Sequence, residues 1–145
     1  MVSEITPEAE PRKEVEDREK RVLLVDDDEA QVFALRHRLE KLGYEVVSAF
    51  SGSQAVAVAH ETPPDLVLLD LRLPDATGFD VCEDLADSPS TCGTPIIILS
   101  AMEGPDIVRQ VRRVGCEFYV RKPYDPNVLL TLIEHALQQE RDWTE

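Results

Sequence analysis

The chain has 145 residues, the usual length of one domain, and 43% of them are hydrophobic, as expected for a globular protein with a buried core. The formal net charge is −14 at pH 7, so neither nucleic acid nor an anionic membrane is expected as a direct partner. The first twenty residues hold seven acidic and four basic residues, a net −3, which leaves −11 on the rest of the chain.

Cysteine usage and hydropathy predict a cytoplasmic protein. The three cysteines show no paired spacing of the kind that metal sites and disulfide frameworks use, so we expect free thiols in a reducing compartment. No apolar run is long enough for a membrane span, and the N-terminus shows no signal-peptide pattern.

Residues 1–20 are rich in Glu, Lys and Arg and poor in apolar anchors, which predicts a charged leader that is either flexible or a short helix. From Arg21 onward, short apolar runs alternate with segments of helical spacing. The runs that we expect to form strands are Val22–Val25, Tyr44–Ala49, Leu66–Leu69, Ile96–Leu99 and Phe118–Val120.

The segments between the runs have helical spacing, and in the first of them the apolar residues share one helical face. In the first helix this face is expected to hold Val32, Leu35, Leu39 and Leu42, and Gly43 is expected to end the helix. The other four helices are expected around Ser53–His60; Phe79, Val81, Cys82 and Leu85; Ile107, Val108 and Val111, closed by Gly115; and Val128, Leu129, Leu132, Ile133, Ala136 and Leu137.

Five strands that alternate with five helices predict an α/β fold, because parallel neighbours need crossover helices. Right-handed crossovers favour a flavodoxin-like (βα)5 three-layer sandwich with a five-stranded parallel sheet in the order 2-1-3-4-5. We expect this domain over residues 21–140, followed by a C-terminal tail at 141–145.

Polar residues follow four of the five expected strands. The first strand runs into Asp26, Asp27 and Asp28, the third into Asp70 and the fourth into Ser100. The fifth strand runs into Arg121 and Lys122. Ligands of open parallel sheets collect at the carboxyl ends of the strands, so these side chains are expected to share one crevice.

The residue types in this crevice predict phosphoryl chemistry. Clustered carboxylates without His or Cys favour a hard divalent cation, Mg²⁺, with Mn²⁺ as a plausible substitute. A lysine and a serine suit phosphoryl oxygens, and a carboxylate can itself accept a phosphoryl group. The pattern therefore predicts a metal-assisted phosphoryl site with Asp70 as the acceptor.

The chain also resembles a known family, the receiver domain of two-component response regulators, or CheY-like superfamily. The resemblance runs from about Arg21 to Gln139 and is carried by four segments in the family's order: VLLVDDDEA, PDLVLLDLRLPDATGFDVC, PIIILSA and FYVRKPYDP. It implies that Asp70 is the phosphorylated aspartate and that Asp26 and Asp27 form an acidic pair. Mg²⁺ would then be bound directly by Asp27, Asp70 and the backbone carbonyl of Arg72, and through water by Asp26.

The resemblance assigns the switch residues as well. Ser100 would bind a phosphoryl oxygen, Ala101 would leave room for it, and Lys122 would pair with the phosphoryl group. Tyr119 would be the aromatic residue whose orientation follows Ser100. The peptide bond before Pro123 would be cis, a geometry that X–Pro bonds commonly permit.

The resulting functional hypothesis is a signalling switch and not an enzyme in the ordinary sense, since it would catalyse only its own aspartyl phosphorylation and dephosphorylation. The expected donor is a sensor histidine kinase or a histidine phosphotransfer protein, and the expected output is binding to a downstream protein target. The last helix lacks the basic residues typical of family members that dimerise to bind DNA, so we expect a monomer or a weak phosphorylation-dependent dimer.

Two alternatives remain open at this point. A phosphohydrolase of the haloacid-dehalogenase type also uses a strand-end Asp, a Ser or Thr, and a Lys, and Asp26 with Asp28 supplies its Asp-x-Asp pattern. A degenerate receiver would serve only as a protein-binding scaffold, and Mg²⁺ would have no effect on it.

Overall fold

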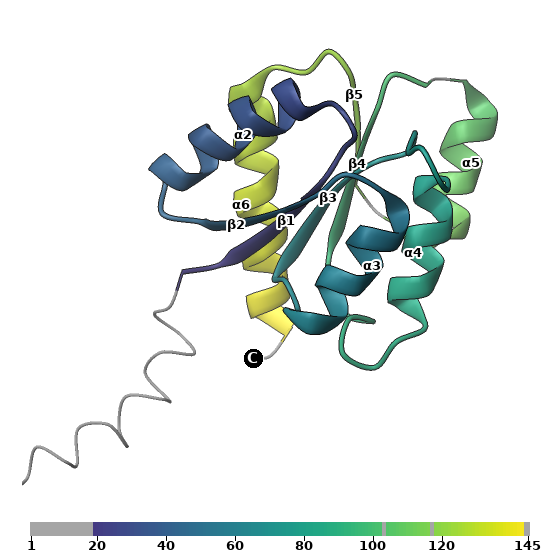
Figure 1. The fold of residues 1–145 in the computed structure, drawn as a ribbon, viewed down its shortest axis with the longest axis horizontal. Helices are drawn as coiled ribbons and strands as arrows, with labels where there is room; N and C mark the ends of the chain where they lie inside the picture. The colour runs from purple at the N-terminus through teal and green to yellow at the C-terminus, as the bar shows by residue number, and fades with distance from the viewer. Residues whose placement is uncertain (1–18, 103, 117, 144–145) are drawn as a thin grey trace, which may run out of the picture.

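The computed structural model describes residues 19–102, 104–116 and 118–143 (Figure 1). The leader expected over residues 1–20 lies outside the described residues except for Glu19 and Lys20. In chain order the elements are β1 (Arg21–Val25), α2 (Glu29–Lys41), β2 (Glu45–Ala49), α3 (Gly52–Glu61), β3 (Leu66–Asp70), α4 (Gly78–Ala86), β4 (Ile96–Ser100), α5 (Pro105–Arg113), β5 (Phe118–Arg121) and α6 (Pro126–Trp143).

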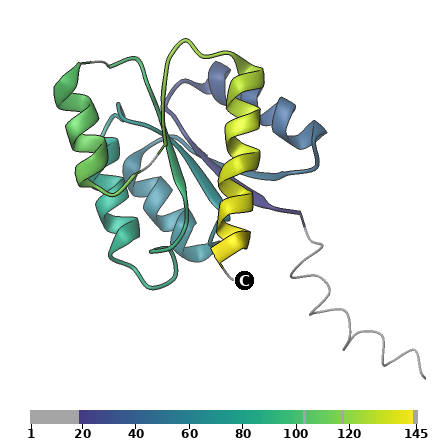
Figure 2. The same cartoon turned by 180° about the vertical axis from the view of Figure 1, so that it is seen from behind.

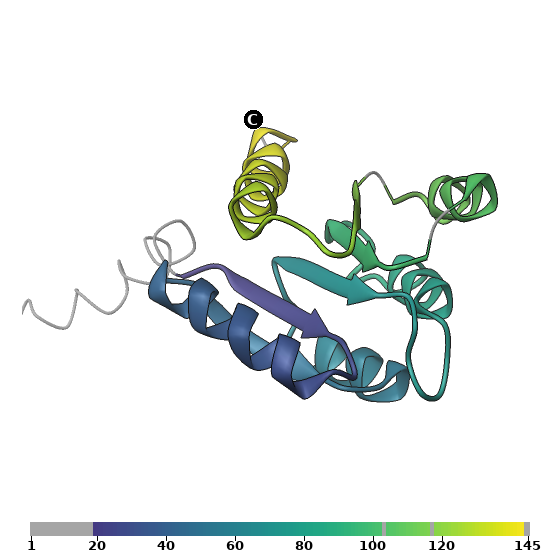
Figure 3. The ribbon, with the colours of Figure 1, turned by 90° about the horizontal axis from the view of Figure 1, so that it is seen from above.

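The strands form one parallel sheet in the order β2-β1-β3-β4-β5, which confirms the predicted fold and strand order. In Figure 3 the arrowheads of β1 and β3 point in the same direction, so their carboxyl ends reach the same edge of the sheet. No helix in the described part of the chain is long and apolar enough to cross a membrane.

Alternation of side chains along β1 builds two apolar layers, one on each face of the sheet. Val22 and Leu24 pack with α2 and α6, whereas Leu23 and Val25 pack with α3, α4 and α5. Figures 1 and 2 show these two helical layers on opposite sides of the strands. β3 is buried along its whole length, because both its faces are covered.

The helix ends follow local chemistry. The Asp28 carboxylate caps α2 by accepting hydrogen bonds from the backbone N–H groups of Ala30 and Gln31. Gly43, with a φ of 95°, supplies the left-handed residue that ends this helix. The expectation for Leu42 is wrong: α2 ends at Lys41, so Leu42 becomes the C-cap and is 59% exposed.

Val108 in α5 and Val128 in α6, two of the apolar residues that indicate these helices in the sequence, are also exposed. At the chain's end α6 continues to Trp143, into the segment expected to form a C-terminal tail. The three cysteines, Cys82, Cys92 and Cys116, are free thiols, as expected. Burial raises the pKa of the Cys82 thiol to about 12, so this side chain behaves as an apolar core residue.

A close backbone approach connects the start of α4 with the end of β3. The N–H of Gly78 donates to the carbonyl of Leu71 at 2.8 Å. A Cβ atom at Gly78 would lie 2.8 Å from the Asp70 carbonyl oxygen and 2.8 Å from the Leu71 Cα. Both are backbone atoms, so a side chain fits at this position only if the strand end moves.

We therefore expect Gly78→Ala to lower the free energy of unfolding by about 2 kcal/mol, the usual cost of overpacking against atoms that cannot rotate away. Gly93→Ala is the matched control, because a Cβ there meets nothing within 4 Å. Its unfolding free energy should stay equal to that of the wild type or rise slightly. Urea unfolding measures both, and equal stabilities of the two variants would contradict the tight approach at Gly78.

Candidate functional site

Four segments bring polar side chains to the carboxyl edge of the sheet. Asp26 follows β1, Asp70 ends β3, Ser100 ends β4 and Lys122 follows β5. Ser100 lies beside the end of β5, since its carbonyl accepts a hydrogen bond from the Lys122 N–H at 2.9 Å. Parallel pairing of β1, β3, β4 and β5 therefore assembles one site from residues that are far apart in the sequence.

The acidic part of the site consists of Asp26, Asp27 and Asp70. One carboxylate oxygen from each lies within 4.8 Å of the others. Asp26 and Asp70 are buried, with 8% and 9% of their surface exposed, whereas Asp27 is open to solvent. Three carboxylate oxygens at this spacing are the hard ligands that Mg²⁺ prefers, so the donor set fits this ion.

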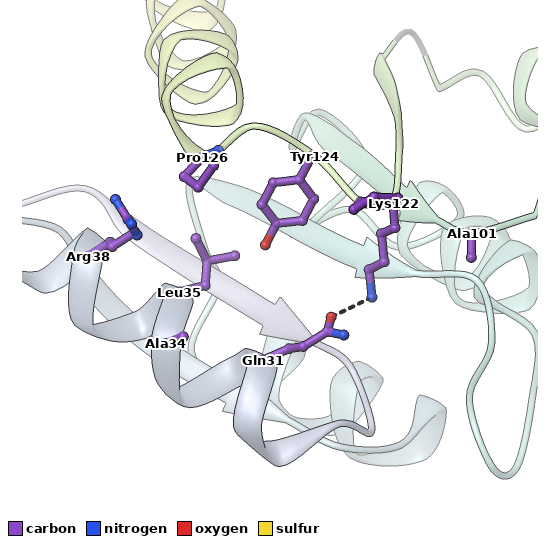
Figure 4. A pocket seen from close by; sticks show the side chains of 9 residues that line it. Gln31, Ala34, Leu35, Arg38, Ala101, Lys122, Tyr124 and Pro126 are labelled. Carbon is purple, nitrogen blue, oxygen red and sulfur yellow. Dashed lines mark hydrogen bonds between the residues drawn. The ribbon is translucent and has the colours of Figure 1, made fainter.

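The ammonium group of Lys122 balances part of this negative charge. Its Nζ donates to Asp26 Oδ2 at 2.9 Å, to Asp70 Oδ2 at 3.3 Å and to the Gln31 Oε1 at 2.9 Å. Figure 4 shows the last of these bonds, which joins α2 to the residue after β5. An ammonium group has three N–H donors, so these three acceptors occupy all of them.

Burial and charge shift the pKa values of the central pair. Loss of solvent raises the pKa of Asp70, and the Asp26 charge adds to this rise, whereas the Arg72 N–H and Lys122 oppose it. Burial by itself would lower the pKa of Lys122, but the hydrogen bonds and charges of Asp26 and Asp70 outweigh it and raise the pKa. The lysine is therefore held charged at neutral pH, while the Asp70 charge is costly without a cation beside it.

Backbone groups fix the directions of the two buried carboxylates. The Asp28 N–H donates to Asp26 Oδ1 at 2.9 Å, and the Arg72 N–H donates to Asp70 Oδ1 at 3.2 Å. In both carboxylates this leaves Oδ2 on the side of Lys122. The segment that carries Arg72 is thereby held against the acidic cluster.

On the β4 side, the backbone of Met102 links two predicted switch residues. The Met102 N–H donates to the Ser100 hydroxyl oxygen at 3.0 Å, and the Tyr119 hydroxyl donates to the Met102 carbonyl. Ser100 is fully buried and Tyr119 is half-buried, while Ala101 is exposed at the rim. The structure thus connects Ser100 with Tyr119 through one peptide segment.

A cavity of about 540 Å³ opens beside Lys122, between α2 and the segment that joins β5 to α6. Figure 4 shows the Tyr124 ring on one side of it and Leu35 on the other. The Lys122–Pro123 peptide bond at its wall is cis. The lining residues are Gln31, Ala34, Leu35, Arg38, Ala101, Lys122, Pro123, Tyr124 and Pro126.

Gln31 is the site residue that the sequence pattern did not reveal. Asp28 caps α2, and Gln31 follows it within the first turn of the helix. The position of Gln31, three residues after the N-cap, is the one signal in the sequence, because it places the side chain in the first helical turn beside the strand ends. The amide itself has no property that marks it as a partner of a lysine 91 residues away.

Known proteins share this fold and this sequence pattern. The family model described as the response regulator receiver domain matches residues 22–134. The protein PilH of Pseudomonas aeruginosa is 33% identical over 117 residues, which cover 81% of this chain and 97% of PilH. The polar-differentiation response regulator DivK of Brucella ovis is 35% identical over 104 residues, which cover 72% of this chain and 85% of DivK.

A longer relative is the response regulator PleD of Caulobacter vibrioides, 36% identical over 113 residues. The match covers 78% of this chain and 25% of PleD, so the chain spans about a quarter of that protein's length.

Among solved structures, a CheY-like receiver domain protein from Methanospirillum hungatei superposes with a TM-score of 0.81 at 28% identity, covering 86% of this chain and 98% of that one. The chemotaxis response regulator CheY4 of Vibrio cholerae gives a TM-score of 0.77 at 29% identity, covering 81% and 98%. With a family match over most of its length and a 33% identical relative, PilH, covered over 97% of its own length, the chain belongs to the response regulator receiver domains of two-component systems.

Proposed function

We propose that this receiver domain accepts a phosphoryl group on Asp70 from a histidine kinase or a histidine phosphotransfer protein, in a reaction that requires Mg²⁺. The observation that carries the proposal is the convergence of Asp26, Asp27, Asp70 and Lys122 at one edge of the sheet. A carboxylate beside a fixed ammonium group can act as nucleophile toward a phosphorus atom whose oxygens that ammonium group binds.

The transfer forms one bond and breaks another. A carboxylate oxygen of Asp70 attacks the phosphorus of a phosphohistidine, the P–N bond breaks, and its electron pair stays on the histidine nitrogen. The product is an aspartyl phosphate on Asp70. Lys122 would bind a phosphoryl oxygen, and the hydrogen bond from its Nζ to Asp70 Oδ2 supports this role.

The residues that would hold Mg²⁺ are Asp27, Asp70 and the Arg72 carbonyl, with Asp26 acting through water. Bound there, the ion supplies positive charge that offsets the acidic cluster and the incoming phosphoryl oxygens. Burial raises the pKa of Asp70, so its charged form gains from any cation that enters the site.

A change at Ser100 would reach the surface through Met102. When the Ser100 hydroxyl turns to a phosphoryl oxygen, the Met102 N–H loses its acceptor, and the carbonyl that holds the Tyr119 hydroxyl moves with it. Phosphorylation would then shift the population of two conformers and present a changed surface to a downstream protein. Ala101, with its small side chain, would leave room for the phosphoryl group.

The haloacid-dehalogenase alternative needs both acids of an Asp-x-Asp motif at the substrate. Here the Asp28 carboxylate is engaged as the N-cap of α2, and the family match is to receiver domains. We do not propose that activity.

Incubation with a small phosphodonor, an acyl phosphate or a phosphoramidate, and Mg²⁺ should add one phosphate to the protein. Asp70→Asn should add none, because the amide is no nucleophile for phosphorus. Asp87→Asn, at an exposed carboxylate on the C-cap of α4, is the matched control and should be phosphorylated like the wild type. Intact-mass spectrometry measures all three, and phosphate on the Asp70→Asn protein would refute the assignment.

Mg²⁺ should raise the melting temperature, because a ligand at 100 times its dissociation constant stabilises the fold by about 2.7 kcal/mol. Asp27→Asn should lose most of this shift. Asp28→Asn removes a neighbouring charge but keeps a good N-cap, so its shift should match that of the wild type. A wild-type melting temperature that does not respond to Mg²⁺ would instead favour the scaffold hypothesis.

The pKa of Asp70 gives a pH test. Because this pKa is raised above the ordinary value of 3.8, the carboxyl group stabilises the fold below pH 3.8 and loses that contribution as the pH rises through the raised value. Asp70→Asn should therefore be more stable than the wild type at pH 7, with the difference shrinking toward pH 3.8.

Asp75→Asn provides the opposite sign for comparison. Backbone hydrogen bonds from Gly52 and Ser53 lower the pKa of Asp75, so its contribution is present at pH 7 and is lost as the pH falls through the lowered value. This variant should be less stable than the wild type at pH 7 and should approach it in acid. Urea unfolding at several pH values measures both variants, and a common sign would contradict the analysis.

A further inference from the structure

The N-terminus of α3 lacks an acidic residue of its own. Acidic side chains in the first turn favour a helix, because they face the positive end of its dipole. α3 has none there, and its side-chain cap is Ser51, which accepts from the Gln54 N–H at 3.1 Å. The helices with an acidic first-turn residue are α2 with Glu29, α4 with Asp80 and α5 with Asp106.

Asp75 supplies the missing carboxylate from another part of the chain. Its Oδ1 accepts a hydrogen bond from the Gly52 N–H at 2.7 Å, and its Oδ2 accepts one from the Ser53 N–H at 3.0 Å. These bonds lower the pKa of Asp75, so the carboxylate is charged at neutral pH. One side chain thus binds two N–H groups that helical hydrogen bonding leaves without acceptors.

Asp75 belongs to the segment that joins β3 to α4, and this segment also carries Arg72. Its other contacts run toward the strand end: Arg72 forms a bridge with Thr77, and the Arg72 N–H donates to Asp70 Oδ1 at 3.2 Å. The segment is therefore fixed on one side to the acidic cluster and on the other side to α3.

The contact between the segment and α3 is tight. A Cβ at Gly52 would lie 3.0 Å from the Ala76 Cβ and 3.3 Å from Asp75 Oδ1. The absence of a side chain at Gly52 lets the helix end and the segment meet closely enough for two short hydrogen bonds. Such a contact restricts the backbone on which Arg72 lies.

We propose that Asp75 is a positioning residue for the metal ligand at Arg72: its two hydrogen bonds to α3 hold the segment so that the Arg72 carbonyl stays at the acidic cluster. The inference rests on the proposed function, because it concerns the same Mg²⁺ site. Asp75 is not among the residues proposed to hold the ion or the phosphoryl group; its carboxylate binds the α3 N–H groups, so its effect on the site would pass through the backbone. Partners of this indirect kind commonly change metal affinity.

Isothermal titration with Mg²⁺ alone is the primary test. Asp75→Ala should raise the Mg²⁺ concentration for half-saturation roughly tenfold. The rate of phosphorylation by a small phosphodonor should fall at low Mg²⁺ and stay at the wild-type value when Mg²⁺ saturates the site. An unchanged half-saturation in Asp75→Ala overturns the proposal.

Ser51→Ala is the matched control, because it removes the other cap of α3 without touching the segment between β3 and α4. It should leave Mg²⁺ affinity unchanged, and a shift as large as that of Asp75→Ala would overturn the proposal. Asp75→Asn removes the charge but keeps one oxygen acceptor, so its shift should be clearly smaller than that of Asp75→Ala. If both Asp75 variants changed the Mg²⁺ concentration for half-saturation equally, the effect would come from the lost charge, and the proposed positioning role of Asp75 would be overturned.

Hydrogen exchange without Mg²⁺ separates this inference from the proposed function. The Arg72 N–H donates to Asp70 Oδ1 and the Gly78 N–H donates to the Leu71 carbonyl. Both amide protons should exchange faster in Asp75→Ala than in the wild type or in Ser51→Ala. Unchanged exchange overturns the ordering role of Asp75 whether or not the wild type binds Mg²⁺. A wild type that takes up neither Mg²⁺ nor phosphate, with faster exchange in the variant, would refute the proposed function and with it the role of Asp75 toward Mg²⁺, and would leave only the ordering of the segment by Asp75.

Discussion

Repulsion between carboxylates at the carboxyl ends of β1 and β3 is the constraint around which the site is built. Asp26 and Asp70 are both buried, and each would raise the energy of the other if no cation lay between them. Lys122, which follows the edge strand β5, supplies this cation, and its ammonium group donates hydrogen bonds to both carboxylates. Loss of Lys122 would leave both buried carboxylates without their cation, so this ammonium group holds the ends of β1, β3 and β5 in one arrangement.

The sheet makes this concentration of charge possible. Its five strands are packed on both faces, and backbone hydrogen bonding along the parallel ladders leaves the strand ends as the place where polar side chains can gather. Backbone N–H groups from Asp28 and Arg72 then orient the two buried carboxylates. The rigid core thus supplies the geometry, and the short segments after the strands supply the ligands. This division suits the population shift that we propose for the protein.

Much of this was visible in the sequence, because strand ends are a local pattern. An apolar run that stops at an aspartate, a serine or a lysine gives the strand, its end and the side chain at that end together, and this is how Asp26, Asp70, Ser100 and Lys122 could be placed. Gln31 and Asp75 could not be placed so, since their partners lie 91 and 23 residues away and depend on how packed elements approach. Leu42 was misplaced because the helix ends one residue before it, a difference smaller than a helical pattern resolves.

The bond between Lys122 and Gln31 has a consequence for how an anion enters the resting site. Two acceptors of Lys122 are carboxylates, while Gln31 offers a neutral amide oxygen and sits at the edge of the open cavity. Under the function that we propose, an arriving phosphoryl oxygen would replace this amide oxygen at Lys122 and leave the bonds to Asp26 and Asp70 in place. The lysine keeps a full complement of acceptors before and after the exchange, so occupancy of the site can alternate without unpairing any charge in the interior.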